Sequence, residues 1–174
     1  MVKAILSLGS NIEPRQEYLE AMERQLAHVL RAPLAKSRLM ETQPVAVGEE
    51  HGWYFNRIVS GWYEGSAHDL LSACNEIERN LGRNRPYELA PRTADIDILL
   101  FGESLIDAPG LRIPHAGLLK RRFCLEGVLE IAPRHLVAPT GLTVAELYYR
   151  IHANVLNQKI IFCDCQDRVQ CSCL

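Results

Sequence analysis

Apolar residues recur along the chain with two different periods, which predict strands that alternate with helices. A continuous apolar run at residues 3–8 predicts a first strand, and the turn-forming sequence GSN ends it. A helix is expected after Pro14, where four apolar residues recur at helical spacing: Leu19, Met22, Leu26 and Val29. Further strands are expected at residues 35–41 and 54–65, on either side of a twelve-residue loop.

A second helix has both a start signal and a stop signal. Ser66 and Asp69 have the spacing of a capping box, in which each side chain accepts a hydrogen bond from the other residue's backbone N–H. Gly82 is placed to end the helix, because glycine readily adopts the left-handed conformation found there. The apolar face between these signals consists of Leu70, Leu71, Cys74, Ile77 and Leu81.

A strand at residues 93–101 completes the order strand, helix, strand, strand, helix, strand. This order predicts an α+β fold of the ferredoxin-like βαββαβ type, with a mainly antiparallel sheet and both helices on one face. Beyond it we expect an extended segment at 111–113 and helices at 118–131 and 144–155. These later helices would cover the second face of the sheet, which gives a sandwich with helices on both faces.

Composition excludes several classes of protein. The chain has 174 residues and a formal net charge of −2, without the basic excess of a general nucleic-acid binder. Its apolar runs are shorter than the roughly 20 residues that a membrane span needs. The first residues read as a strand and not as a signal peptide. We therefore expect a cytoplasmic protein, as a monomer, with reduced thiols.

Asp95 and Asp97 lie two residues apart where a loop becomes an apolar strand. Because side chains on a strand alternate, both carboxylates point the same way, with Ile96 and Ile98 opposite. Two like charges at a buried strand end repel each other and are costly to desolvate. Magnesium relieves this repulsion, and it is usually held by one or two carboxylates together with substrate phosphates.

Arginines flank the two acids and allow two interpretations. Arg83, Arg85 and Arg92 offer forked donors that suit phosphate, which favours a site for phosphoryl transfer. Alternatively, Arg85 and Arg92 pair with the two aspartates in a purely structural salt-bridge cluster. The sequence has no Walker A motif, so a P-loop is excluded.

The six cysteines fall into two groups. Cys74 and Cys124 lie within apolar patterns and are predicted to be small core residues. The other four crowd into the end of the chain, which we divide into a domain at 1–160 and a cysteine-rich tail at 161–174. Zinc binding or reactive thiols are both possible for this group: Cys163, Cys165, Cys171 and Cys173.

Six motifs together resemble the 6-hydroxymethyl-7,8-dihydropterin pyrophosphokinase family of folate biosynthesis. In order they are SLGSN, ETQP, YFN, EIERNLGR, PRTADIDILLFG and IPH followed by RRF. The resemblance runs from about Ala4 to Pro133. It implies a ferredoxin-like fold and an enzyme that transfers pyrophosphate from ATP to the hydroxymethyl oxygen of the pterin, with release of AMP.

The resemblance also implies roles for individual residues. Asp95 and Asp97 would bind two magnesium ions that bridge the ATP phosphates, while Arg83 and Arg92 would grip those phosphates from a mobile loop. The pterin would lie between two aromatic rings and meet two polar side chains at its edge: Tyr54 and Phe123, and Thr42 and Asn56. The nucleotide side would be lined by Asn75, Glu78, Arg85, Ile98, Arg112, His115 and Arg121.

Two positions depart from the family pattern. The loop before Pro91 reads PYELA, so Leu89 or Ala90 stands where the family has a tryptophan that closes over the site. Ala116 follows His115, where the family commonly has a tyrosine. The first departure bears on how the loop closes over the site, and the second implies that one contact to the nucleotide is missing.

Three hypotheses for the function remain. The first is the pterin pyrophosphokinase, which is favoured because all four charged residues of the central site are present. The second is a non-catalytic nucleotide- or metal-binding module of the same fold with a thiol-rich sensor tail. The third is a metal-dependent phosphohydrolase, which would need a water-activating base near the acids, and none is obvious in the sequence.

Overall fold

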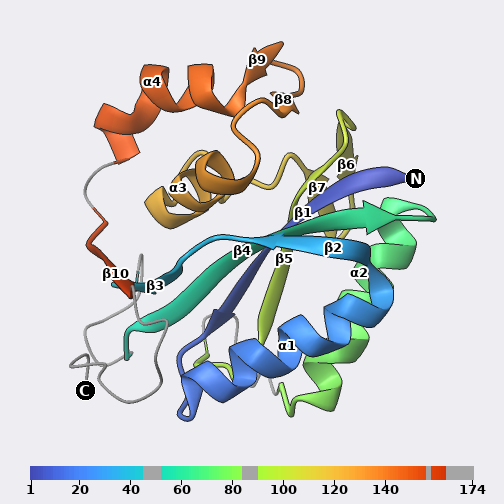
Figure 1. Cartoon of the computed structure of the whole chain (residues 1–174), viewed down its shortest axis with the longest axis vertical. Coiled ribbons are helices and arrows are strands. Elements are labelled where there is room, and N and C mark those ends of the chain that lie inside the picture. Colours follow the sequence, from blue (N-terminus) through green and yellow to red (C-terminus); the bar gives the residue numbers. More distant parts are fainter. Residues whose placement is uncertain (45–51, 84–89, 156–157, 164–174) are drawn as a thin grey trace.

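A computed structural model describes residues 1–44, 52–83, 90–155 and 158–163 of the chain. Its centre is a six-stranded sheet in the order β10-β3-β4-β1-β5, in which β2 also pairs with β4, and every pairing is antiparallel (Figure 1). The strands are β1 (Val2–Ser10), β2 (Arg31–Lys36), β3 (Leu39–Thr42), β4 (Tyr54–Tyr63), β5 (Asp95–Phe101) and β10 (Ile160–Cys163).

Helices cover both faces of this sheet. The helices α1 (Arg15–Val29) and α2 (Ala67–Asn80) lie on one face, α3 (Arg122–Ile131) lies on the other, and α4 (Val144–Val155) packs on α3 (Figure 1). Two small hairpins complete the fold: β6 (Ile106–Ala108) with β7 (Leu111–Ile113), and β8 (Leu136–Val137) with β9 (Leu142–Thr143). The predicted ferredoxin-like sandwich is confirmed.

The alternation of side chains along β1 divides the core into two layers. Ala4, Leu6 and Leu8 are fully buried beneath α1 and α2. Ile5, on the opposite side of the same strand, packs in the layer beneath α3. Because both faces of β1 are apolar at this end, helices must cover the strand on both sides.

The predicted signals at the ends of α2 are confirmed. The Ser66 hydroxyl accepts a hydrogen bond from the Asp69 N–H at 3.2 Å, and the Asp69 carboxylate accepts one from the Ser66 N–H at 3.0 Å. Gly82 has φ +76°, the left-handed conformation that favours glycine.

Three boundaries differ from the sequence prediction. The strand expected at 35–41 is two strands, because the Ser37 hydroxyl replaces a backbone carbonyl as the acceptor for the Ile58 N–H at 2.9 Å. The helix expected to start at 118 starts at Arg122, after a series of turns. Strand β10 was not predicted, and it lies across the proposed boundary at residue 160.

Within the described residues, no helix is both long and apolar enough to cross a membrane.

Candidate active site

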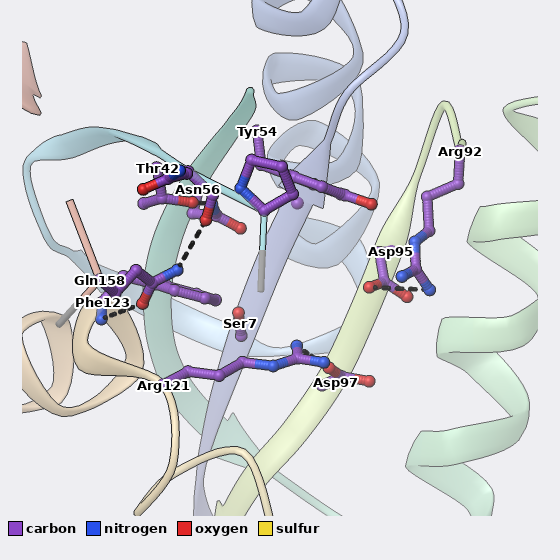
Figure 2. Close-up of a pocket in the computed structure, with 13 residues that line it drawn as sticks. Ser7, Thr42, Tyr54, Asn56, Arg92, Asp95, Asp97, Arg121, Phe123 and Gln158 are labelled. Atoms are coloured by element: carbon purple, nitrogen blue, oxygen red, sulfur yellow. Dashed lines mark hydrogen bonds and ion pairs between the residues drawn. The ribbon is translucent and has the colours of Figure 1, made fainter. Parts of the chain in front are cut away.

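A pocket lies where the face of the sheet toward α3 changes from apolar to polar. Ile5, Met40, Ile58 and Leu99 belong to the apolar layer on that face. Further along the same strands, polar residues or glycine take the positions that face the same way. These residues line the pocket (Figure 2): Ser7 and Gly9 on β1, Thr42 on β3, Asn56 on β4, and Asp95 and Asp97 on β5.

One half of the pocket is acidic. The two oxygens of Asp95 contact different arginines: Oδ1 lies 2.8 Å from Arg83 Nη2, and Oδ2 lies 3.3 Å from Arg92 Nη1. Asp97, which pairs with Ser7 in the sheet, has a longer contact of 3.6 Å to Arg121 Nη1. Ile96 and Ile98 are buried on the opposite face, so the predicted shared orientation of the two carboxylates is confirmed.

The environment of Asp97 disfavours its negative charge. Burial is the main cause that raises the pKa of the Asp97 carboxyl, and the neighbouring charge of Asp95 adds to it. His115, Arg121 and Arg92 act in the opposite direction but do not reverse the shift. The carboxylate is therefore short of positive charge, and a cation bound in this pocket would stabilise it.

Arg83 is held between two carboxylates. Its side chain is 6% exposed and forms ion pairs with Glu78 as well as with Asp95. Glu78, on α2, also accepts a hydrogen bond from the Ile96 N–H at 2.7 Å. These contacts tie the end of α2 to the start of β5 and fix the orientation of Asp95. The structure therefore places Arg83 behind Asp95 rather than in the pocket.

Arg92 is fixed by the turn after β1. The Asn11 carboxamide oxygen accepts a hydrogen bond from the Arg92 N–H at 2.8 Å, and the Asn11 N–H donates to the Arg92 carbonyl at 3.2 Å. The Arg92 guanidinium lies 6.0 Å from the centre of the Tyr54 ring, at the limit of a cation–π contact. The SLGSN motif thus positions an arginine that lines the pocket.

The other half of the pocket has aromatic and amide groups (Figure 2). The Asn56 carboxamide donates to the Thr42 hydroxyl at 2.7 Å, and both side chains are buried. Tyr54 and Phe123 line the same space. Ser7, on β1, lies between this half and the acidic half (Figure 2).

Several lining residues were not singled out from the sequence. Gln158 lies beside Phe123 and just before β10, far along the chain from the other residues of the pocket (Figure 2). The sequence offered a signal for Ser7, which is a polar residue inside an apolar strand. The other lining residues of this kind are Gly9, Gln43 and Pro44.

Comparison with known proteins gives the site a family. Residues 5–133 match the sequence family of 7,8-dihydro-6-hydroxymethylpterin-pyrophosphokinase (HPPK). The chain belongs to the HPPK family. The resemblance inferred from the six motifs is confirmed.

Curated members of the HPPK family cover most of the chain. The 2-amino-4-hydroxy-6-hydroxymethyldihydropteridine pyrophosphokinase of Pseudomonas aeruginosa is 34% identical over 154 residues, which are 83% of this chain and 89% of the relative. The enzyme of the same name from Bacillus subtilis is 36% identical over 129 residues, 74% of this chain and 77% of the relative.

Solved structures with an HPPK part share the fold. The wild-type HPPK-DHPS of Plasmodium falciparum, solved with pterin and p-hydroxybenzoate, superposes with a TM-score of 0.66 at 15% identity. The match covers 89% of this chain and 44% of the Plasmodium chain, so this chain spans less than half of that protein. At this identity the likeness concerns the fold alone.

The residues expected on the nucleotide side of an HPPK site are not all in one place. Arg121 lines the pocket, whereas Arg112 and His115 line a separate hollow of about 420 Å³ beside the β6–β7 hairpin. Asn75 is exposed on α2, and the Ile98 side chain is 3% exposed in the core beneath α1 and α2. Glu78 is buried, as described above, and Arg85 lies outside the described residues.

Three of the four predicted zinc ligands lie outside the described residues: Cys165, Cys171 and Cys173. Cys163 is half-buried in β10. In the part of the chain that the structure describes, no group of three or more metal-ligating side chains is present. Cys74 and Cys124 are buried as predicted, and burial raises the pKa of the Cys74 thiol to about 12.

Proposed function

We propose that this chain transfers pyrophosphate from ATP to the hydroxymethyl group of 6-hydroxymethyl-7,8-dihydropterin, as a step of folate biosynthesis. The hydroxymethyl oxygen attacks the β-phosphorus, the bond between that phosphorus and the oxygen bridging to the α-phosphorus breaks, and AMP leaves. The observation that carries this proposal is a single pocket that joins two carboxylates and two arginines to an aromatic and amide wall. Family membership supports the same activity.

Magnesium fits the acidic half of the pocket. Asp95 and Asp97 face the same space, and among the described residues the ion pair of Asp97 is a long one, at 3.6 Å to Arg121. Carboxylate oxygens are the ligands that magnesium prefers, with substrate phosphates completing its shell. Asp95 and Asp97 would hold two ions, which supply positive charge to the triphosphate.

The arginines have different parts in this proposal. Arg92 and Arg121 line the pocket and each now contacts a carboxylate, so they are free to exchange that partner for a phosphate when the nucleotide binds. Arg83 keeps its ion pairs with Glu78 and Asp95 and holds Asp95 in position. In this proposal Arg92 and Arg121 contact phosphate directly, whereas Arg83 acts through Asp95.

The pterin would occupy the other half of the pocket. Tyr54 and Phe123 offer aromatic faces for a flat ring system. Thr42 and Asn56 are hydrogen-bonded to each other at 2.7 Å and so present a fixed set of polar atoms to the edge of the ring. Buried polar groups of this kind discriminate against rings that leave them without partners.

The proposal is tested by measuring AMP release from ATP with magnesium and the reduced hydroxymethylpterin. We expect the wild-type chain to release AMP in a pterin-dependent reaction and Asp97→Ala to lose at least about 1,000-fold in kcat while it remains folded. Glu103→Ala removes an exposed acid elsewhere and serves as the matched control, with unchanged activity. Release of ADP instead of AMP would contradict the proposal.

The same experiment separates the proposal from a non-catalytic module. A module that only binds nucleotide would take up ATP with magnesium and release no AMP at any pterin concentration. Calorimetry with a non-hydrolysable ATP analogue measures that uptake, and nucleotide binding that is indifferent to magnesium would contradict the role of the two aspartates.

The cytoplasmic location expected from the sequence stays a prediction.

A further inference from the structure

We propose that Gln158 is a positioning residue for the pterin half of the site, an inference that rests on the proposed function. Its side-chain amide bridges two walls of the pocket (Figure 2). Nε2 donates a hydrogen bond to the Gln43 carbonyl at 3.1 Å, and Oε1 accepts one from the Phe123 N–H at 3.4 Å. One side chain near the end of the chain thus joins the end of β3 to the start of α3.

The start of α3 needs this acceptor. The first N–H groups of a helix have no partner within the helix. Arg121, the residue at the N-cap, supplies no side-chain cap for α3. Gln158 supplies the acceptor for the N–H of Phe123, through a long and therefore weak hydrogen bond. Phe123 lines the pocket at this helix end, so the bond bears on its position. Arg121 is held separately, because its N–H donates to the Gly117 carbonyl at 2.9 Å in the turn before the helix.

The backbone after Gln158 holds the amide in place. Strand β10 pairs antiparallel with β3, and Ile160 lies opposite Thr42. The Gln43 N–H adds a hydrogen bond to the Lys159 carbonyl at 3.2 Å. Without β10 the outer edge of β3 would present unpaired backbone groups. Residues 158–163 therefore form part of the frame of the pocket.

The position of this frame makes the effect selective. Gln43 follows Thr42, whose hydroxyl is bonded to Asn56 in the half of the pocket proposed for the pterin. Asp95 and Asp97 lie across Ser7 on the far side (Figure 2). Asp95 is supported from α2 and from the turn after β1, and Asp97 is held by the pairing of β5 with β1. Small displacements of a positioning group strongly affect binding. Loss of the Gln158 bridge should weaken pterin recognition and leave nucleotide recognition intact.

The test is Gln158→Ala, with the KM of each substrate measured separately. We expect the KM for the pterin to rise about tenfold, the size of effect that one or two lost hydrogen bonds produce. The KM for ATP should stay within about twofold, because the acidic half is supported independently. Lys159→Ala is the matched control, since its exposed side chain leaves and its backbone carbonyl stays, and both KM values should be unchanged.

A second variant and a direct measurement keep the test decisive. Gln158→Glu keeps the shape and the acceptor but replaces the donor to the Gln43 carbonyl, so it should also raise the pterin KM selectively. Pterin affinity measured with a non-hydrolysable ATP analogue and magnesium should fall in both variants. An unchanged pterin KM, or an equal rise for ATP, would overturn the inference. If the wild-type chain itself released no AMP, the proposed function would be what had failed.

Discussion

Asp97 shows how the requirements of the site oppose stability. The pKa of its carboxyl is raised, first by burial and then by the charge of Asp95. A carboxyl whose pKa is higher in the folded chain than in the unfolded chain favours folding only while it is protonated. Its contribution to stability is therefore present below the unfolded pKa and is lost as pH rises through the folded pKa. At neutral pH the ligand-free protein carries this cost for a charge that the reaction needs.

Asp97→Asn should therefore stabilise the ligand-free protein and abolish its activity. Removing the charge relieves the repulsion by Asp95, while the lost contact to Arg121 is long and of little value. At pH 7 we expect Tm to rise by roughly 2–4 °C for each 1 kcal/mol that is relieved. Thermal melting from pH 5 to pH 8 should show the difference shrinking toward acid pH. A lower Tm at pH 7, or a difference independent of pH, would contradict the argument.

Gly9 leaves room for the Asn56 carboxamide. A Cβ at position 9 would lie 2.9 Å from Asn56 Oδ1, which is closer than real Cβ contacts come. We expect Gly9→Ala to push the carboxamide away from Thr42 and to raise the pterin KM by about tenfold through the lost hydrogen bond. Steady-state kinetics for both substrates will measure this. A pterin KM equal to that of the wild type would show that the carboxamide has no role in recognition.

Among the elements, α3 lies close to the sheet because it carries a glycine. A Cβ at Gly127 would come within 3.0 Å of Ile58 Cβ and 3.1 Å of Met40 Cε, at the centre of the layer beneath α3. This close approach brings the N-terminus of the helix, with Phe123, over the pocket. The packing of the helix and the shape of the site are therefore linked.

Gly127→Ala should destabilise the protein, although glycine to alanine within a helix normally stabilises it. An added methyl group in a packed core costs about 1–3 kcal/mol, more than the 0.4–1 kcal/mol gained from the unfolded chain. Urea unfolding should show a lower midpoint with an unchanged slope. Ser72→Ala, on the exposed face of α2, is the control and should change stability little. A higher midpoint for Gly127→Ala would mean that α3 can move away from β4 without cost.

The sequence predicted the elements that have strong local signals and missed those that depend on distant partners. The capping box at Ser66 and the alternation through Asp95 and Asp97 are local, and both predictions are confirmed. The apolar sequence IIFC in β10 could have suggested a strand, but only its pairing with β3 gives it a place. Gln158 has no local signal, because its partners Gln43 and Phe123 are far away in the sequence.

On the scale of the whole molecule, the site lies where four antiparallel strands, β1, β3, β4 and β5, change from apolar to polar residues on the face toward α3. Each strand continues the core with Ile5, Met40, Ile58 or Leu99 before this change. The apolar part fixes the register, since a shift by one residue would turn every side chain to the other face. The register in turn brings Asp97 of β5 opposite Ser7 of β1, and Asp95 opposite Gly9. Stability and placement of the site thus depend on the same alternation.

The same architecture bears on the cysteine-rich end of the chain. Among the residues that the structure describes, those that line the pocket all lie at or before position 158, and β10 ends at Cys163. The family match ends earlier still, at residue 133. We therefore expect the frame of the site to extend through β10, which crosses the division predicted at residue 160. The division itself stays a prediction.

Deletion of residues 164–174 should leave catalysis unchanged. We expect kcat and both KM values to stay within about twofold of those of the full chain. A twofold change corresponds to less than about 0.5 kcal/mol. The deletion removes Cys165, Cys171 and Cys173 but keeps Cys163 in its pairing with Leu39, so the support of β3 is retained. The assay is run with and without zinc, a chelator and a thiol oxidant. If the full chain responds to these agents and the shortened chain does not, the tail is a sensor; loss of activity on deletion would give it a part in the site.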